Sequence, residues 1–143
     1  MDRKQVIALV FILLMVGSSV GALFTALFKK KDTSNEIPTQ KVLNYKLSEL
    51  QRKTLLPKGY TLVEYDYPQA CYDCERQKGL LEGWVAQSDN QIYLQEGFTT
   101  GDKATVTMAS YKGTDSLTGP TDDEIRGSLC DLLAQRALWC VEV

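Results

Sequence analysis

The sequence contains no histidine among its 143 residues. This absence excludes Ser-His-Asp triads, Cys-His proteases, zinc sites built on histidine and the side chain that most often shuttles protons. The formal net charge of −2 gives no excess of basic residues of the kind that binds nucleic acid. Four cysteines and the carboxylates are therefore the obvious reactive side chains. The length leaves room for one modest domain and an appendage.

Charge is absent from residues 6–28, a run of about 23 residues with basic residues at both flanks. As a helix this run would be roughly 35 Å long, which is enough to cross a hydrocarbon core of ~30 Å. We therefore expect an uncleaved N-terminal transmembrane anchor over residues 1–31 that binds membrane lipid. The alternative is a signal peptide cleaved near Ser19-Val20-Gly21, but the apolar run continues past that site.

The flanks of this run give opposite indications of orientation. Lys29, Lys30 and Lys31 follow it, and basic residues favour the cytoplasmic side. A short basic N-terminus before a first span is also typical of a signal-anchor that exports the domain behind it. Paired cysteines in a small domain suit an oxidising compartment. We therefore expect a single-pass protein of the cell membrane with an extracytoplasmic domain.

The rest of the chain is acidic. Five of the 16 basic residues and one of the 18 acidic residues precede residue 32, so the remainder has a net charge of −6. Nucleic acid and anionic lipid head groups would repel such a domain, so we expect no nucleic-acid partner. Solubility is the simplest role for this charge.

Three segments are expected along the chain: the anchor over residues 1–31, a polar tether with a juxtamembrane helix over residues 32–59, and a folded domain over residues 60–143. Leu43, Leu47 and Leu50 have helical spacing, which predicts a helix over residues 41–53. Such a helix would pack on the domain or contact a partner beside the membrane.

Beyond this helix, the hydrophobic pattern alternates between strand and helix periods, which predicts an α/β or α+β layer fold. The expected strands cover residues 60–67, 91–96 and 105–111. One expected helix covers residues 71–87 and a second begins at residue 121. Residues 138–143 are expected to form a short strand or an extended tail. Residues 112–119 are rich in turn formers. Thr121 and Glu124 have the spacing of a capping box, which supports the last helix.

The motif Cys71-Tyr72-Asp73-Cys74 lies between an expected strand and an expected helix. Cys71 would occupy the first helical turn, where free backbone N–H groups and the helix dipole favour a thiolate. Cys74 is within reach for a disulfide across one turn. A dithiol so placed can attack a substrate disulfide through Cys71 and release the mixed disulfide through Cys74.

Over roughly residues 60–133 the chain resembles the thioredoxin-like superfamily, with a strand, the CxxC motif, a helix, two strands, a turn with glycine and a closing helix. The resemblance implies a small thioredoxin-like domain in which Cys71 is the nucleophile and Cys74 the resolving thiol. It also implies a buried acid on the strand before the motif that accepts the proton of the second cysteine. Glu64 is the candidate, one residue further from Cys71 than is usual, and an exposed strand carboxylate is the alternative. We expect no cofactor and no metal.

Three features differ from the pattern of this family. The stretch Lys103-Ala104-Thr105-Val106 lacks the proline that the family places, as a cis-proline, opposite the motif. Residues 97–102 are too few for the helix that many members have there. Asp73, Glu75 and Asp66 place negative charge around the motif, which disfavours a stabilised thiolate. A reductase or isomerase is therefore expected rather than a strong oxidant.

Cys130 and Cys140 form a second pair. We expect a structural disulfide that pins the C-terminus and contributes ~3 kcal/mol in the chain-entropy model. Free buried cysteines are the next candidate. The Cys-x9-Cys spacing does not fit a zinc ribbon, and a relay of electrons between the two pairs stays open.

Two functions follow from these patterns. The first is a membrane-anchored thiol–disulfide oxidoreductase that acts on protein thiols and disulfides or on a membrane redox partner. The second is a non-catalytic accessory subunit of a membrane complex with two structural disulfides. The position of the CxxC motif favours the first, while the anchor, the acidic surface and the missing proline suit the second. Exposure of Cys71 distinguishes them.

Overall fold

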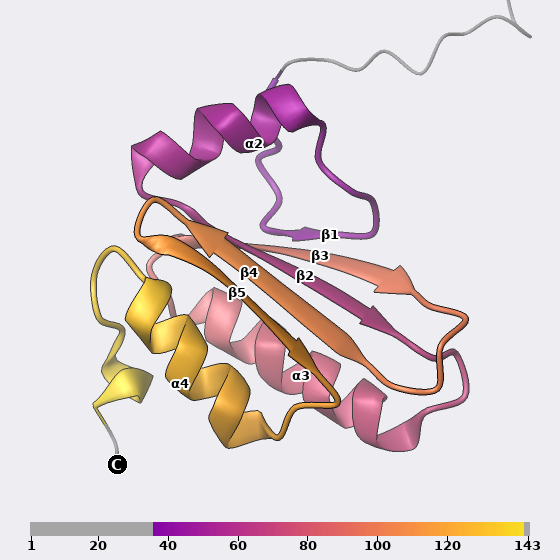
Figure 1. Cartoon of the computed structure of the whole chain (residues 1–143). Helices are drawn as coiled ribbons and strands as arrows, with labels where there is room; N and C mark the ends of the chain where they lie inside the picture. The colour runs from indigo at the N-terminus through magenta and orange to yellow at the C-terminus, as the bar shows by residue number, and fades with distance from the viewer. Residues whose placement is uncertain (1–35, 142–143) are drawn as a thin grey trace, which may run out of the picture. The chain divides into compact units, whose positions relative to one another are not determined.

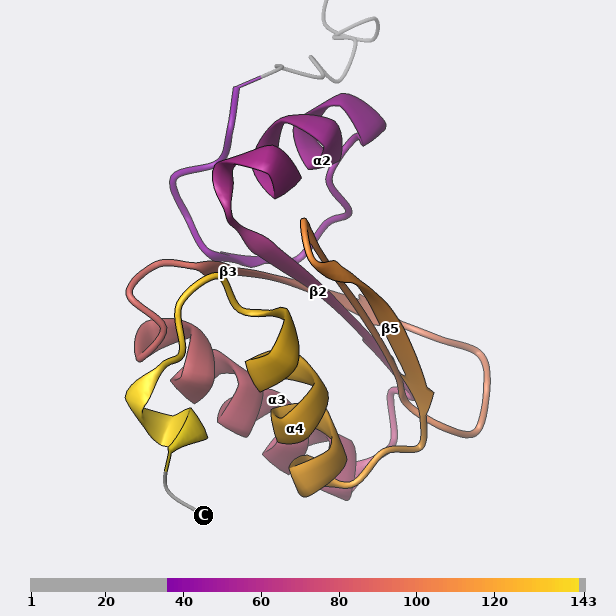
Figure 2. The same cartoon turned by 60° about the vertical axis from the view of Figure 1, so that its left-hand side comes forward.

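A computed structural model describes residues 36–141 of the chain. The expected anchor over residues 1–31, with its lipid contact and orientation, lies outside the described residues. Within residues 36–141 no helix has the length and apolar character needed to cross a membrane. Figure 1 shows a sheet with α2 on one face and α3 and α4 on the other, and Figure 2 shows the same layers from the side.

The sheet has five strands in the order β1-β3-β2-β4-β5. The elements are β1 Val42–Leu43, α2 Glu49–Leu55, the 3-10 turn η1 Leu56–Lys58, β2 Thr61–Tyr67, α3 Tyr72–Ala86, β3 Ile92–Phe98, β4 Thr105–Ser110, β5 Gly113–Thr118, α4 Asp122–Leu132 and the 3-10 turn η2 Leu138–Cys140. Strand β3 runs parallel to β1 and β2, while β4 is antiparallel to β2 and β5 is antiparallel to β4. This mixed α/β sheet with three α-helices fits the thioredoxin-like domain expected from the sequence.

The N-terminal part of the described chain differs from the prediction. The single helix expected over residues 41–53 is wrong, because Leu43 lies in β1 beside β3 and α2 begins only after its capping residue Ser48. Leu43 and Leu47 pack with Leu55 and with β2 and β3 residues in one apolar cluster, whereas Leu50 is 53% exposed, so the three spaced leucines do not share one buried face.

The same packing moves the start of the folded unit. The described residues from Glu36 onward belong to the compact unit that contains the sheet. Residues 41–58, which the sequence assigned to a tether and a juxtamembrane helix, supply β1, α2 and η1 to this unit. The expected domain boundary at residue 60 therefore differs from the structure.

The C-terminal half contains one strand that the sequence pattern did not show. Residues 112–119 were expected as a turn-rich segment, but β5 pairs with β4 from Gly113 to Thr118. Most side chains of β5 are exposed, since β5 is the edge strand of the sheet. Its polar composition therefore resembles a turn. Residues 138–140 form η2, so a strand there, which was one of the two alternatives expected for residues 138–143, is wrong.

The alternation of side chains along β2 determines which residues reach each helical layer. Val63, Tyr65 and Tyr67 are buried in the core beneath α3 and α4. Leu62 packs in the smaller cluster beneath α2. Because successive strand residues point to opposite faces, Glu64 lies on the α2 face. This alternation determines the surroundings of the CxxC motif.

Candidate functional site: the Cys71–Cys74 disulfide

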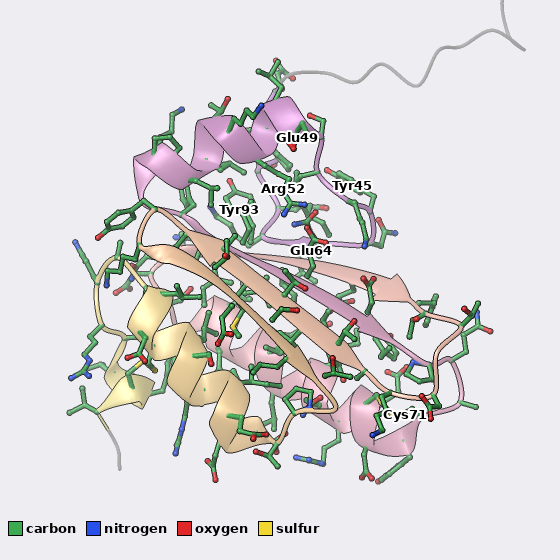
Figure 3. The ribbon with its side chains drawn as sticks, viewed as in Figure 1. Tyr45, Glu49, Arg52, Glu64, Cys71 and Tyr93 are labelled. Atoms are coloured by element: carbon green, nitrogen blue, oxygen red, sulfur yellow. A yellow bond between two sulfur atoms is a disulfide. The ribbon has the colours of Figure 1, made fainter. Side chains whose placement is uncertain are left out.

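Cys71 and Cys74 lie where β2 leads into α3, as the sequence predicted. Cys71 is the N-cap of α3, and its Sγ accepts a hydrogen bond of 3.2 Å from the backbone N–H of Cys74. The two residues are joined in a disulfide, with their Cα atoms 5.2 Å apart. Figure 3 labels Cys71 at the N-terminal end of α3. The fold therefore places one sulfur of the pair at the positive end of a helix.

The two cysteines differ in exposure. Cys71 is half-buried, whereas Cys74 is 6% exposed and belongs to the core. Tyr72, between them, is 87% exposed. An incoming reagent thus meets Cys71 first, which agrees with the order of nucleophile and resolving thiol that the resemblance implies.

A cleft of about 540 Å³ opens beside the disulfide. It lies between the starts of α3 and α4 and the loop before β4. Its lining residues are Cys71, Asp73, Cys74, Arg76, Gln77, Asp102, Lys103, Ala104, Gly119, Pro120, Thr121, Asp122 and Asp123. Both cysteines line the cleft, so a molecule bound there would lie against the disulfide.

Polar contacts hold one wall of this cleft together. Arg76 Nη1 lies 2.6 Å from Asp122 Oδ2, and Gln77 Nε2 donates to Pro120 O at 3.0 Å and to Asp122 Oδ1 at 3.1 Å. The hydrogen bond from Arg76 holds the pKa of the Asp122 carboxyl below its usual value. Thr121 and Glu124 form the predicted capping box at the start of α4, which confirms that expectation. The starts of α3 and α4 are thereby fixed relative to each other.

Tyr65 of β2 contacts the second cysteine of the motif from the buried side. Its hydroxyl oxygen lies 3.1 Å from Cys74 O and 3.0 Å from Gln77 Oε1. Tyr65 is fully buried, and burial raises the pKa of its hydroxyl, so the group beneath Cys74 is a neutral phenol. No pattern in the sequence indicated this role, although Tyr65 is one residue closer to the motif than Glu64.

Glu64 does not lie with the cysteines. Its carboxylate pairs with Arg52 and lies 3.5 Å from Lys46 Nζ. Figure 3 shows Glu64 beside Arg52, on the α2 side of the sheet. A shift of one residue along a strand exchanges the two faces, so the register that brings Tyr65 to Cys74 turns Glu64 away. The expectation that Glu64 serves as a proton acceptor for Cys74 is not supported by this placement.

The structure places another carboxylate, Glu96, on the α3 face of the sheet. Glu96 is the β3 partner of Tyr65, and its Oε2 lies 3.3 Å from Lys78 Nζ, four residues after Cys74 on α3. Burial raises the pKa of the Glu96 carboxyl and outweighs the opposing effect of Lys78. No sequence signal identified Glu96, because its position depends on the parallel register of β2 and β3.

The loop before β4 also lines the cleft. Ala104 is buried there, and its carbonyl accepts a hydrogen bond of 2.7 Å from Gly119 N. Residues 36–141 contain no cis peptide bond. The wall opposite the motif is therefore formed by Lys103 and Ala104 in trans geometry.

Cys130 and Cys140 form a second disulfide, with Cα atoms 5.8 Å apart. It joins the end of α4 to η2 and neither cysteine lines the cleft. Beside it, Trp139 stacks on Trp84 of α3 with ring centroids 5.3 Å apart. Among the described residues no cluster of three or more His, Cys, Asp or Glu could hold a metal ion.

Comparisons with known proteins match solved structures but no sequence family. No family model matches the sequence, and no curated protein matches it. Fasciola hepatica thioredoxin is similar in structure with 12% identity and a TM-score of 0.48, covering 65% of this chain and 99% of that chain. Trxlp from Edwardsiella tarda EIB202 is similar with 16% identity and a TM-score of 0.45, covering 66% and 99%. The description of this chain as a thioredoxin-like fold depends on its own strand order and connectivity.

Proposed function

We propose that this protein is a membrane-anchored thiol–disulfide oxidoreductase of the reductase or isomerase type. The observation that carries the proposal is the Cys71–Cys74 disulfide, which lies at the N-terminus of α3 on the wall of an open cleft. A disulfide that serves only stability needs neither a helix N-terminus nor access to solvent.

The reaction starts from the reduced pair. The Cys71 thiolate attacks a substrate disulfide, forms a mixed disulfide and displaces one substrate sulfur as a thiolate. The Cys74 thiolate then attacks the Cys71 sulfur, releases the second substrate sulfur and forms the Cys71–Cys74 disulfide. Two electrons pass from the protein to the substrate. An external dithiol or a membrane redox partner returns them through the reverse exchange.

Charge around the motif supports the reductase or isomerase type. Asp73 and Glu75 lie in the first turn of α3 and oppose the positive helix end. The neutral hydroxyl of Tyr65 adds no positive charge beneath Cys74. A strong oxidant depends on a stabilised thiolate, which these groups disfavour.

The sequence supports attachment to the cell membrane through residues 6–28, whose length and lack of charge suit a spanning helix. Two disulfides support an extracytoplasmic domain, because disulfides persist in oxidising compartments. The substrates would then be thiols and disulfides of exported proteins, or a partner within a membrane complex.

A redox titration of the full chain tests the proposal, with the two disulfides distinguished by alkylation and peptide mapping. We expect the Cys71–Cys74 pair to have a reduction potential above about −300 mV, nearer to the thioredoxin range of about −270 mV. We also expect Cys74→Ser to accumulate a mixed disulfide with substrate. A lower potential together with an empty trap would falsify the proposal.

A non-catalytic accessory subunit is the second candidate. The observations that favour it are the burial of Cys74 and the trans geometry of the loop at Ala104. This candidate predicts that both disulfides resist reduction equally and that Cys71→Ala leaves the assembly of its membrane complex intact. The same titration therefore decides between the two functions.

A further inference from the structure

Acidic side chains outnumber basic ones around the cleft beside the disulfide. The acidic residues that line it are Asp73, Asp102, Asp122 and Asp123, and the basic residues that line it are Arg76 and Lys103. The cleft lies at two helix N-termini, which by themselves would attract anions. The acids in the first turns of α3 and α4 oppose that attraction.

Two of these aspartates already have partners. Asp122 pairs with Arg76 at 2.6 Å, and Asp123 pairs with Arg126 at 3.1 Å. Within residues 36–141, Asp73 and Asp102 form no salt bridge, and both are exposed. Asp73 belongs to the motif, where it interacts electrostatically with Arg76, and Asp102 belongs to the loop before β4, so the two aspartates without a salt bridge come from two different walls of the cleft.

We propose that this cleft selects polypeptide disulfides whose cysteines are flanked by lysine or arginine. This inference rests on the proposed function and specifies its substrate class. A peptide sulfur that reaches Cys71 brings its neighbouring residues to Asp73 and Asp102. Cationic neighbours gain Coulomb attraction at these exposed carboxylates, and acidic neighbours are repelled. Arg76 and Lys103 are the opposing charges: Arg76 is paired with Asp122, and the side chain of Lys103 lies close to Gly119.

Two model peptides of equal length test the proposal. Each carries one cysteine, flanked on both sides by lysine in one peptide and by glutamate in the other, as a mixed disulfide with thionitrobenzoate. The Cys71 thiolate of the reduced full chain attacks the peptide sulfur and displaces the coloured thionitrobenzoate anion. The Cys74 thiolate then attacks Cys71 and releases the peptide thiol, so two electrons leave the protein. Cys71→Ala measures the background reaction.

We expect the lysine peptide to react about tenfold faster at low ionic strength. This preference should decline with added salt and be nearly lost at 1 M, where the Debye length is about 3 Å. Asp102→Asn should lower the ratio of the two rates by about two- to fivefold. Lys103→Met should raise the ratio. A ratio of rates cancels any change in the intrinsic reactivity of the cysteine.

Asp131→Asn is the matched control, because Asp131 is an exposed carboxylate near the far end of α4 and does not line the cleft. It changes the net charge as Asp102→Asn does, so it should leave the ratio nearly unchanged. Equal rates for the two peptides, or equal effects of the two variants, would overturn the inference and leave the proposed function standing. Absence of any release that depends on Cys71 would overturn the proposed function, and the inference with it.

Discussion

The Tyr65 hydroxyl lies 3.1 Å from the carbonyl oxygen of Cys74 and 3.0 Å from Gln77 Oε1. A single buried phenol therefore connects the central strand β2 to the second cysteine of the motif and to the side chain that holds the start of α4. Because Tyr65 lies on the central strand, it couples the cleft wall to the most buried part of the sheet.

Tyr65→Phe removes this hydroxyl and leaves buried acceptors without their donor. We expect the free energy of unfolding to fall by about 1–3 kcal/mol, the usual cost of an unsatisfied buried polar group. Urea unfolding monitored by circular dichroism measures this change. Tyr111→Phe is the control, because Tyr111 is exposed and the same atom is lost. Equal stability of the two variants would show that the Tyr65 hydroxyl has no structural role.

The Arg76–Asp122 pair predicts loss of stability in acid. Arg76 holds the pKa of Asp122 below its usual value of 3.8, so the folded state favours the ionised carboxylate. This contribution is fully present above the usual value and is lost as the pH falls through the lowered pKa. The stability difference between wild type and Asp122→Asn should therefore be largest near neutral pH and shrink below pH 3.8. A difference that stays constant between neutral pH and strong acid would contradict this assignment.

Glu96 predicts the opposite dependence on pH. Burial raises the pKa of Glu96 above its usual value of 4.5, so the folded state favours the protonated acid. This contribution is present below the usual value and is lost as the pH rises through the raised pKa. Relative to wild type, Glu96→Gln should therefore gain stability as the pH increases above 4.5. Urea midpoints of both proteins across this range, with Asp131→Asn as control, test the sign of the change.

The helices α3 and α4 were predicted because their signals are local. The apolar residues of α3 repeat at helical spacing, and Thr121 and Glu124 form a capping box at the start of α4. The CxxC motif was placed at a β-to-α junction because the pattern before it is typical of a strand and the pattern after it is typical of a helix. β5 was missed because an exposed edge strand needs no apolar alternation, and only pairing with β4 reveals it.

The surroundings of the motif depended on register, which the sequence does not reveal. The assignment of Glu64 differed from the structure by one residue, and that difference moves a side chain to the other face of the sheet. Glu96 reaches the α3 face through the parallel pairing of Tyr65 with Glu96, a contact 31 positions apart along the chain. Likewise, Leu43, Leu47 and Leu50 have helical spacing but lie in a strand, a loop and a helix, and only Leu43 and Leu47 are buried.

The last prediction concerns the Cys130–Cys140 disulfide, which links η2 to α4. This bond closes a loop with a sequence separation of 10 and holds η2, where Trp139 stacks on Trp84. The double variant Cys130→Ser with Cys140→Ser should lose about 3 kcal/mol of unfolding free energy in the chain-entropy model. Trp139 is buried, so release of η2 should shift tryptophan emission to longer wavelength.

The matched control is Cys71→Ser with Cys74→Ser, which removes a disulfide with a sequence separation of 3 and leaves the tryptophan pair in place. A shorter loop restricts the unfolded chain less, so this control should lose less stability. It should also keep the emission of the folded wild type. Equal losses in both variants, with no shift in emission, would show that η2 is held by apolar packing alone and that the second disulfide is dispensable for the fold.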